Sequence, residues 1–456
     1  MEERASANLP AHTLMQRAGL AVARLAMAVA PHANVIWIAC GPGNNGGDGY
    51  EAARYLKQWG KSPLVTADLD HTGNLPADAA ASHQSALEAG VMMSVEAPLE
   101  YDLCIDALFG IGSIREINAP YTGWIKQINS GRAPVLAVDT PSGLSAETGT
   151  CHSPCVRADY TLSLLTLKPG LFTADGREVC GEIWLDPLNI TESGEGCSKL
   201  NCTPPFVTRA HNTHKGSFGD VCIVGGAPGM AGAAYLAALA AIHGGAGRTY
   251  LAKLDESLPQ FDSGLPEVMF RTATEIAYES MVIVAGCGGG NSIATHLPRI
   301  LERACLLVLD ADALNAISRD ASLQNQLAAR KPHSTVLTPH PLEAARLMNM
   351  RAVDVQTNRL AVAQAIADRF GCTVVLKGSG TIIAAPGILP RINATGNARL
   401  ATAGTGDVLA GLIGARLASG GDVFCHTCES VYRHGKVADE WHGSSTMTAH
   451  DLASNL

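Results

Sequence analysis

The sequence predicts an α/β protein of two consecutive domains, each built on a largely parallel sheet that is covered by helices. Short apolar runs alternate with longer segments of helical periodicity in both halves of the chain, as is typical of such sheets. A chain of 456 residues is also too long for one ordinary core. Over residues 191–205 the periodicity disappears and the segment is polar, so we expect a linker between domains 1–190 and 206–456.

The composition describes a well-buried globular protein. Hydrophobic residues make up 47% of the chain and charged residues 16%, which disfavours disorder. The net charge of −9 argues against general binding to nucleic acid or to an anionic membrane. The apolar segment 19–30 is interrupted by Arg24, which indicates an amphipathic helix, and the stretch 230–242 is too short to cross a bilayer. We therefore expect a soluble, cytoplasmic protein.

Several of the 13 cysteines lie in apolar runs, where a cysteine behaves as a small buried hydrophobic residue. Two close pairs, Cys151/Cys155 and Cys425/Cys428, have no matching second pair at the distance that a zinc finger requires. The pattern therefore disfavours zinc and redox roles and indicates a reducing compartment.

In the first half, an amphipathic helix precedes a strand over Val35–Cys40. The loop 41–49, GPGNNGGDG, follows this strand at once and leads into a helix expected over Tyr50–Trp59. A strand, a glycine-rich loop and a helix in this order are typical of nucleotide-binding folds, although the spacing is not that of the dinucleotide fingerprint. Further strands are expected over 63–67, 103–108, 135–139, 160–165 and 183–185.

Polar residues in three loops of this half suggest one site. Asn44, Asn45 and Asp48 offer oxygens that suit a hard cation, and the neighbouring glycine amides suit a pyrophosphate. Asp106 and Asp139 each end a predicted strand, and the carboxyl ends of strands in a doubly wound sheet converge on one crevice. Taken singly, either aspartate is more simply explained as a cap of a helix or turn; together, the three loops favour a site.

The motifs GNNGGDG (43–49), DALFGIG (106–112), VDTPSGLSAETG (138–149) and TLKPGL (166–171) resemble the NAD(P)H-hydrate epimerase family. The resemblance covers nearly the whole first half and implies a Rossmann-like three-layer αβα domain. It implies Asp139 as the catalytic acid/base group and a potassium ion held by Asn45, Asp106 and Ser142. The implied contacts to the hydrated nucleotide are Asn44, Asn45, Gly46, Gly47, Asp48, Gly110, Ile111, Gly112, Ser113, Ile114, Arg115, Glu116 and Asp139. One departure is Gly110-Ile111-Gly112-Ser113, where the family has glycine, threonine, glycine and leucine.

The second half repeats the alternation of strands and helices in a different pattern. Strands are expected over 220–224, 248–252, 281–285, 306–310, 335–338, 373–377 and 381–384. Long helices are expected over 231–243, 356–370, 407–418 and 422–441.

The stretch Gly404–Asp407 opens the helix expected over 407–418 and is an anion site by construction, because unpaired N–H groups and the helix dipole point at one spot. A carboxylate there indicates a proton acceptor, although Asp407 alone could equally be a helix cap. Lys377 and Thr381 flank two glycines at the end of a strand, as a phosphate clamp would. Together these features describe a ribokinase-like phosphotransfer fold.

The set resembles more closely the ADP-dependent NAD(P)H-hydrate dehydratase family, a lyase branch of the ribokinase-like fold, over residues 210–456. The motifs are GCGGGN (286–291), LDADALNA (309–316), TPHPLEAARLM (338–348), VLKGSGT (375–381) and TGNARLATAGTGDVLAG (395–411). The implied contacts to the hydrate are Ala233, Gly288, His340 and the catalytic base Asp407. The implied contacts to ADP or AMP are Lys377, Gly378, Ser379, Gly380, Thr381 and Gly406. Cys287-Gly288-Gly289 departs from the proline, glycine and leucine of relatives, which leaves the contacting glycine open by a residue or two.

A chain that joins these halves resembles bifunctional NAD(P)H-hydrate repair enzymes. Such an enzyme epimerises the R and S hydrates of NADH and NADPH (NADHX and NADPHX) and dehydrates the S form with ADP, giving NAD(P)H, AMP and phosphate. The resemblance also implies magnesium bound with the nucleotide and a homo-oligomer. Two alternatives are a ribokinase-like kinase of a stable small alcohol and a non-catalytic binding scaffold.

Overall fold

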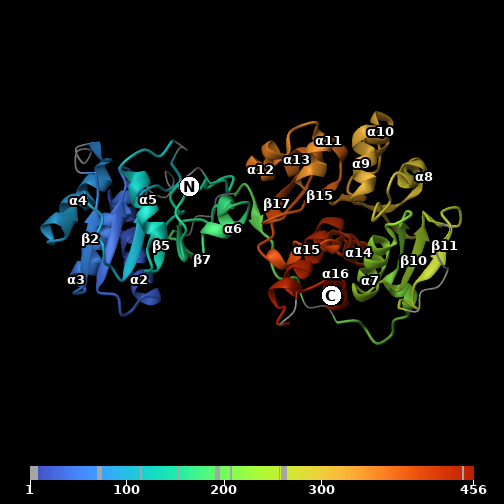
Figure 1. The fold of residues 1–456 in the computed structure, drawn as a ribbon, viewed down its shortest axis with the longest axis horizontal. Helices are drawn as coiled ribbons and strands as arrows, with labels where there is room; N and C mark the ends of the chain where they lie inside the picture. The colour runs from blue at the N-terminus through green and yellow to red at the C-terminus, as the bar shows by residue number, and fades with distance from the viewer. Residues whose placement is uncertain are drawn as a thin grey trace. The chain divides into compact units, whose positions relative to one another are not determined.

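The computed structural model describes residues 9–68, 74–112, 116–151, 154–190, 196–205, 208–255, 257, 264–443 and 446–456. The chain forms two compact units, Met1–Gly196 and Cys197–Leu456 (Figure 1). The segment 191–205 was expected to be a linker without regular structure, but Lys199–Leu200 within it form strand β8. This strand pairs with β17 in the sheet of the second unit. A strand of two residues is too short to leave a periodic pattern in the sequence.

The first unit is built on a seven-stranded sheet in the order β3-β2-β1-β4-β5-β6-β7, in which all neighbouring strands are parallel. Because the order reverses between β1 and β4, the ends of these two strands form the switch point where ligands of such folds bind. The strands are β1 (Val35–Cys40), β2 (Ser62–Thr66), β3 (Met92–Ser94), β4 (Leu103–Ala107), β5 (Val135–Val138), β6 (Tyr160–Leu164) and β7 (Glu182–Asp186).

Helices cover both faces of this sheet. Ile36 and Ile38 pack into the core cluster that includes residues of helices α2 and α3, whereas Trp37 and Ala39 pack into a separate cluster with α5. Such alternation along one strand, with both faces buried, gives the three-layer αβα arrangement that the sequence predicted. The helices are α2 (Thr13–Val29), α3 (Asn44–Gln58), α4 (Ala77–Glu88), α5 (Tyr121–Ser130) and α6 (Gly176–Val179).

Helix α3 begins at Asn44, so the expected helix start at Tyr50 was wrong and most of the expected loop 41–49 is helical. Glycine lowers helix propensity, which is why the sequence favoured a loop. Close packing explains these glycines instead. A Cβ atom at Gly46 would lie 2.0 Å from the carbonyl oxygen of Gly41, and one at Gly49 would lie 2.6 Å from the Ala107 Cβ.

The second unit is built on a ten-stranded sheet in the order β11-β10-β9-β12-β13-β14-β15-β16-β17-β8. Neighbours are parallel from β11 to β15 and from β17 to β8, and antiparallel around β16. The strands after β8 are β9 (Asp220–Gly225), β10 (Arg248–Lys253), β11 (Met269–Arg271), β12 (Val282–Ala285), β13 (Leu306–Leu309), β14 (Thr335–Leu337), β15 (Thr373–Leu376), β16 (Ile382–Ala385) and β17 (Ile388–Ile392).

The helix expected over 356–370 is two helices, α12 and α13, because the backbone leaves the helical region at Asn358. The remaining long helices lie within two residues of their expected bounds. The helices of this unit are α7 (Ala231–His243), α8 (Leu297–Arg303), α9 (Asp312–Arg319), α10 (Ala321–Ala328), α11 (Pro341–Met348), α12 (Ala352–Thr357), α13 (Arg359–Phe370), α14 (Thr405–Ala418), α15 (Val423–Asp439) and α16 (Ala449–Ser454).

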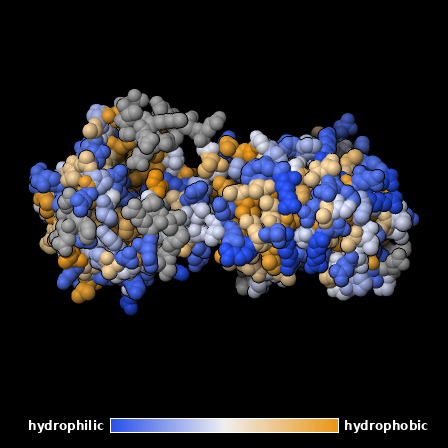
Figure 2. Space-filling view, turned by 90° about the horizontal axis from the view of Figure 1, so that it is seen from above, coloured by the Kyte–Doolittle hydropathy of each residue, from blue (hydrophilic) through white to orange (hydrophobic). Residues whose placement is uncertain are grey.

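The surface mixes polar and apolar residues. Figure 2 shows hydrophilic and hydrophobic side chains interspersed over the visible face of each unit. None of the described helices combines the length and the apolar character that a bilayer span requires.

Helices α7 and α14 lie side by side (Figure 1). They approach closely at Gly411, where a Cβ atom would lie 2.0 Å from the carbonyl oxygen of Ala237. We predict that Gly411→Ala lowers the free energy of unfolding of the second unit by about 2 kcal/mol, because the two backbones must separate. Urea unfolding followed by circular dichroism measures the change. Gly232→Ala in α7 is the control, since nothing lies within 4 Å of that position. Equal stability of the two variants would contradict the prediction.

Candidate active sites

In the first unit, oxygen atoms gather around Asp106 near the end of β4. Its fully buried carboxylate accepts hydrogen bonds from the backbone N–H of Ser142 at 2.8 Å and from the Ser142 hydroxyl at 2.6 Å. Burial raises the pKa of Asp106 to about 6, although the hydrogen bonds from Ser142 lower it. The structure therefore joins two of the three predicted potassium ligands and leaves a carboxylate that a cation would stabilise.

The third predicted ligand, Asn45, lies in the first turn of α3 and faces the loop after β4. A Cβ atom at Gly110 would lie 3.1 Å from the Asn45 Oδ1 atom. The Asn45 Nδ2 atom is buried and has no hydrogen-bond partner within the described chain. A buried N–H donor in this state is costly, so the site fits a hydrogen-bond acceptor of a bound ligand, whereas a cation would contact the Oδ1 atom.

The other predicted contacts of this unit differ in their exposure to solvent. Gly46 and Gly47 are buried against neighbouring protein atoms, whereas Asn44, Ile111 and Glu116 are exposed. Gly112 is exposed, and Asp48 is half-buried. Ser113, Ile114 and Arg115 lie outside the described residues.

Asp139 follows β5 in a left-handed backbone conformation, with φ of 66°. Such strain in a non-glycine residue is concentrated at functional sites. Its Oδ1 atom accepts a hydrogen bond from the backbone N–H of Leu164 at 3.1 Å and forms an ion pair with Lys168. The Lys168 ammonium also donates to the carbonyl oxygen of Leu164 at 2.7 Å. The sequence did not single out Lys168, because its partner Asp139 lies 29 residues away and leaves no local pattern.

In the second unit, an ion pair joins the ends of two strands. The Lys377 ammonium, after β15, lies 2.6 Å from the Oδ1 atom of Asp310, after β13, and the Thr338 hydroxyl donates to the same oxygen at 2.7 Å. Burial alone would lower the pKa of Lys377, but the carboxylates of Asp310 and Glu343 raise it above its ordinary value. Asp310 belongs to the motif LDADALNA, but no spacing rule identified it as a site residue.

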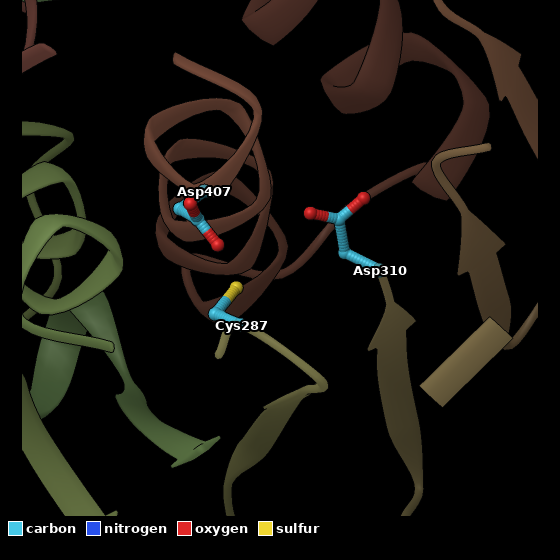
Figure 3. A group of neighbouring side chains, drawn as sticks. All are labelled: Cys287, Asp310 and Asp407. Atoms are coloured by element: carbon cyan, nitrogen blue, oxygen red, sulfur yellow. The ribbon is translucent and has the colours of Figure 1, made fainter. Parts of the chain in front are cut away.

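Asp407 lies in the first turn of α14 and completes this cluster. Figure 3 shows Asp407, Cys287 and Asp310 converging from three different elements, and one ligand atom of each lies within 4.8 Å of the others. Burial and the charge of Asp310 raise the pKa of Asp407 to about 6. A Cβ atom at Gly406 would lie 3.2 Å from the Lys377 Nζ atom, so two of the predicted nucleotide contacts are neighbours.

This cluster does not fit a resident magnesium ion. Magnesium requires hard oxygen ligands in a near-octahedral shell, whereas Cys287 offers sulfur and Lys377 already occupies an oxygen of Asp310. Burial and the Asp407 carboxylate raise the pKa of Cys287, which favours the neutral thiol.

Among the predicted hydrate contacts of the second unit, Ala233 and Gly288 are neighbours, whereas the His340 side chain bonds within its own helix. A Cβ atom at Gly288 would lie 3.0 Å from the Ala233 Cβ, so these two residues are neighbours. His340 instead caps helix α11: its Nδ1 atom accepts from the backbone N–H of Leu342 at 3.1 Å. Its Nε2 atom lies 3.3 Å from Glu343, and its side chain is 46% exposed. Both ring nitrogens of His340 thus have partners within its own helix.

A second residue that the sequence did not identify, His434 of α15, contacts the turn that opens α14. Its Nε2 atom hydrogen-bonds the carbonyl oxygen of Thr405 at 2.9 Å. Burial lowers the pKa of His434 to about 4, so the neutral ring donates this bond. His434 therefore fixes the peptide between Thr405 and Gly406.

Each half of the chain matches a known protein family. Residues 221–456 match the family model described as NAD(P)H-hydrate dehydratase, and residues 11–170 match the one described as YjeF-related protein N-terminus. A bifunctional NAD(P)H-hydrate repair enzyme from Escherichia coli is 35% identical over 98% of this chain and 89% of its own length. The chain belongs to the bifunctional NAD(P)H-hydrate repair enzyme family. A family member from Coxiella burnetii is 32% identical over 98% of this chain and 94% of its own.

Solved structures resemble the second half of this family member. An ADP/ATP-dependent NAD(P)H-hydrate dehydratase from Bacillus subtilis, crystallised with ATP and Mg²⁺, is 30% identical and covers 54% of this chain and 90% of its own, with a TM-score of 0.47. A ribokinase-like superfamily protein from Enterococcus faecalis is 27% identical and covers 54% and 88%, with a TM-score of 0.48.

The ion pair between Lys168 and Asp139 is largely buried, which makes it testable through stability. We predict that Lys168→Met destabilises the first unit by about 3 kcal/mol, because it leaves a buried carboxylate without its cation. Tryptophan fluorescence during urea unfolding reports on this unit, which holds four of the five tryptophans. The double variant Lys168→Met/Asp139→Asn should recover part of the loss. A double variant less stable than Lys168→Met would contradict this interpretation.

Proposed function

We propose that this protein repairs hydrated NADH and NADPH in two steps. The first unit interconverts the R and S hydrates, and the second unit dehydrates the S form with ADP, giving NAD(P)H, AMP and phosphate. Family membership supports both activities. The observation that carries the dehydration is the position of Asp407, a carboxylate with a pKa of about 6 in the first turn of a helix and near the half-buried Lys377.

In the second unit, Asp407 accepts the proton of the C6 hydroxyl group of the hydrate. A carboxylate with a pKa near 6 is ionised at neutral pH and still basic enough for this transfer. The hydroxyl oxygen then attacks the β-phosphorus of ADP, and the bond from this phosphorus to the bridging oxygen breaks, which releases AMP. Lys377 and the N–H groups that open α14 stabilise the negative charge of the transferred group.

Phosphate then leaves C6 far more readily than hydroxide does. The lone pair of the ring nitrogen expels it, and loss of a proton from C5 restores the dihydronicotinamide ring. Ala233, Gly288 and His340 are proposed to contact the hydrate in this unit. The segment Lys377–Thr381, with Gly406, is proposed to hold the nucleotide, and magnesium bound to the phosphates would neutralise part of their charge.

In the first unit, Asp139 is the proposed acid/base group, and the ammonium of Lys168 orients its carboxylate. Epimerisation at C6 requires the ring to open or to lose and regain water, and both routes need proton transfer. The predicted contacts 44–48 and 110–116 are proposed to bind the hydrate. Asn45, Asp106 and Ser142 are proposed to hold a potassium ion, whose charge would offset that of the buried carboxylate.

We predict that Asp407→Asn slows dehydration of the S hydrate at least about 100-fold, because the proton acceptor is lost. Epimerisation should persist in this variant. In the unsubstituted protein, kcat/KM should fall about tenfold per pH unit below a pH of about 6, where Asp407 becomes protonated. Recovery of dihydronicotinamide absorbance from mixed hydrates and ADP measures both effects.

Asp422→Asn is the control for this assay, because Asp422 caps α15 and accepts from the backbone N–H of Cys425 at 2.7 Å. It should leave dehydration within twofold. A normal rate in Asp407→Asn would refute the proposed base. Accumulation of a stable phosphorylated alcohol without dihydronicotinamide would favour a small-molecule kinase instead.

The potassium site can be tested without the reaction. The pKa of Asp106 is raised from its ordinary value of 3.8 to about 6 in the folded state, so the first unit loses stability as the pH rises from 3.8 to about 6. Above that range the buried carboxylate is ionised, and a bound cation offsets the lost stability. We predict that potassium, compared with choline at equal ionic strength, raises the unfolding temperature of this unit by about 3 °C at pH 7.5 and has no effect at pH 5.

Asp106→Asn should abolish the potassium effect. Asp102→Asn is the matched control and should retain it, since Asp102 is exposed and accepts hydrogen bonds from the backbone N–H groups of Asn34 and Val35. A potassium response that is unchanged in Asp106→Asn would place the ion elsewhere.

A further inference from the structure

A buried arginine lies directly behind the loop that follows β15. Arg359, the first residue of α13, is 1% exposed. Its guanidinium donates hydrogen bonds to the carbonyl oxygens of Leu376 at 3.1 Å, Lys377 at 3.3 Å and Gly380 at 3.4 Å. It also donates to the Oε1 atom of Gln356 at 2.7 Å. The side chain therefore spans the loop from its first residue to its turn.

The position of this cation is unfavourable for helix α13 itself. Burial lowers the pKa of Arg359 to about 10, which still leaves the group charged at neutral pH. A positive charge in the first turn of a helix is also repelled by the helix dipole. The break between α12 and α13 at Asn358 puts Arg359 in that turn. Burial and repulsion by the helix dipole both disfavour the charge of Arg359, so its hydrogen bonds to the loop carbonyls must stabilise it. The same hydrogen bonds order the loop.

The loop is shaped around the guanidinium. Gly378 has φ of 135°, and a Cβ atom there would lie 2.9 Å from the Arg359 Nη1 atom. The Thr381 hydroxyl donates to the carbonyl oxygen of Gly378 at 3.1 Å. In a trans peptide the N–H group points away from the preceding carbonyl. With the carbonyls of Lys377 and Gly380 held toward Arg359, the N–H groups of Gly378 and Thr381 point to the opposite side.

We infer that Arg359 is a positioning residue for the phosphate groups of a nucleoside mono- or diphosphate. It holds the carbonyls of Lys377 and Gly380 so that the N–H groups of Gly378 and Thr381 face the anion, and its buried charge reinforces that of Lys377. This inference rests on the proposed function, in which Lys377–Thr381 bind ADP. Arg359 is proposed to touch neither the hydrate nor ADP and to act through the loop Lys377–Thr381.

The test uses the full-length protein and titrates ADP, AMP and adenosine by calorimetry. Arg359→Met should weaken ADP and AMP binding by about 10- to 100-fold, because the loop loses hydrogen bonds to a charged group, and should leave adenosine binding within twofold. In the assay that follows dihydronicotinamide absorbance from mixed hydrates and ADP, the KM of Arg359→Met for ADP should rise. Its KM for the hydrate and its epimerase rate should stay within twofold of those of the unsubstituted protein.

Arg359→Lys keeps the charge but has a single nitrogen, so the group that bonds the loop carbonyls is no longer anchored by a second one bonded to Gln356. It should weaken ADP binding by about three- to tenfold and remain measurable if Arg359→Met fails to fold. Arg369→Met is the matched control, since Arg369 lies at the exposed end of α13 and donates to the carbonyl oxygen of Leu347 at 2.9 Å. It should bind ADP normally.

Normal ADP affinity in Arg359→Lys, or equal losses of ADP and adenosine binding in Arg359→Met, would overturn the inference and leave the proposed function intact. An unsubstituted protein that binds neither ADP nor AMP would refute the proposed function itself.

Discussion

The contact between Lys377 and Asp310 is the interaction on which the second site depends. It ties the ends of β13 and β15 together at 2.6 Å and places a positive charge beneath the turn that opens α14. The paired aspartate still raises the pKa of Asp407, so one ion pair supplies a cation for phosphate and helps to keep its neighbouring carboxylate basic. Removal of either partner would leave the other charge buried, which makes the geometry of this cluster strongly constrained.

Three carboxylates, Asp106, Asp139 and Asp407, lie in three different environments. Asp106 has only neutral donors as hydrogen-bond partners, and burial raises its pKa although these hydrogen bonds lower it. Asp139 is paired with the ammonium of Lys168 and held in a strained backbone conformation. Asp407 has a thiol and a second carboxylate as neighbours. These environments are compatible with the three proposed roles, which are a ligand of a bound cation for Asp106, an oriented acid/base group for Asp139 and a proton acceptor for Asp407.

Much of this arrangement was predictable because parallel strands bring their carboxyl ends to one edge of a sheet. Asp106 and Asp139 were predicted as site residues from strand ends in that way, and Asp407 was predicted from a glycine-rich turn that opens a helix. The start of α3 was not, because packing of Gly46 and Gly49 overrides their low helix propensity. Lys168 and Arg359 were not identified either, since a partner 29 residues away, or loop carbonyls behind a helix, leave no local pattern.

The short strand β8 determines at which residue a fragment that contains only the second unit should begin. Lys199–Leu200 cover the edge of β17, and the buried Asn201 side chain bonds the Asn393 side chain and the Cys428 carbonyl oxygen. A fragment that began at residue 206 would lose these contacts and uncover an edge strand in which Ile388 and Leu389 are exposed. Uncovered edges of this kind invite intermolecular pairing. A recombinant dehydratase fragment should therefore begin before Cys197 to avoid aggregation.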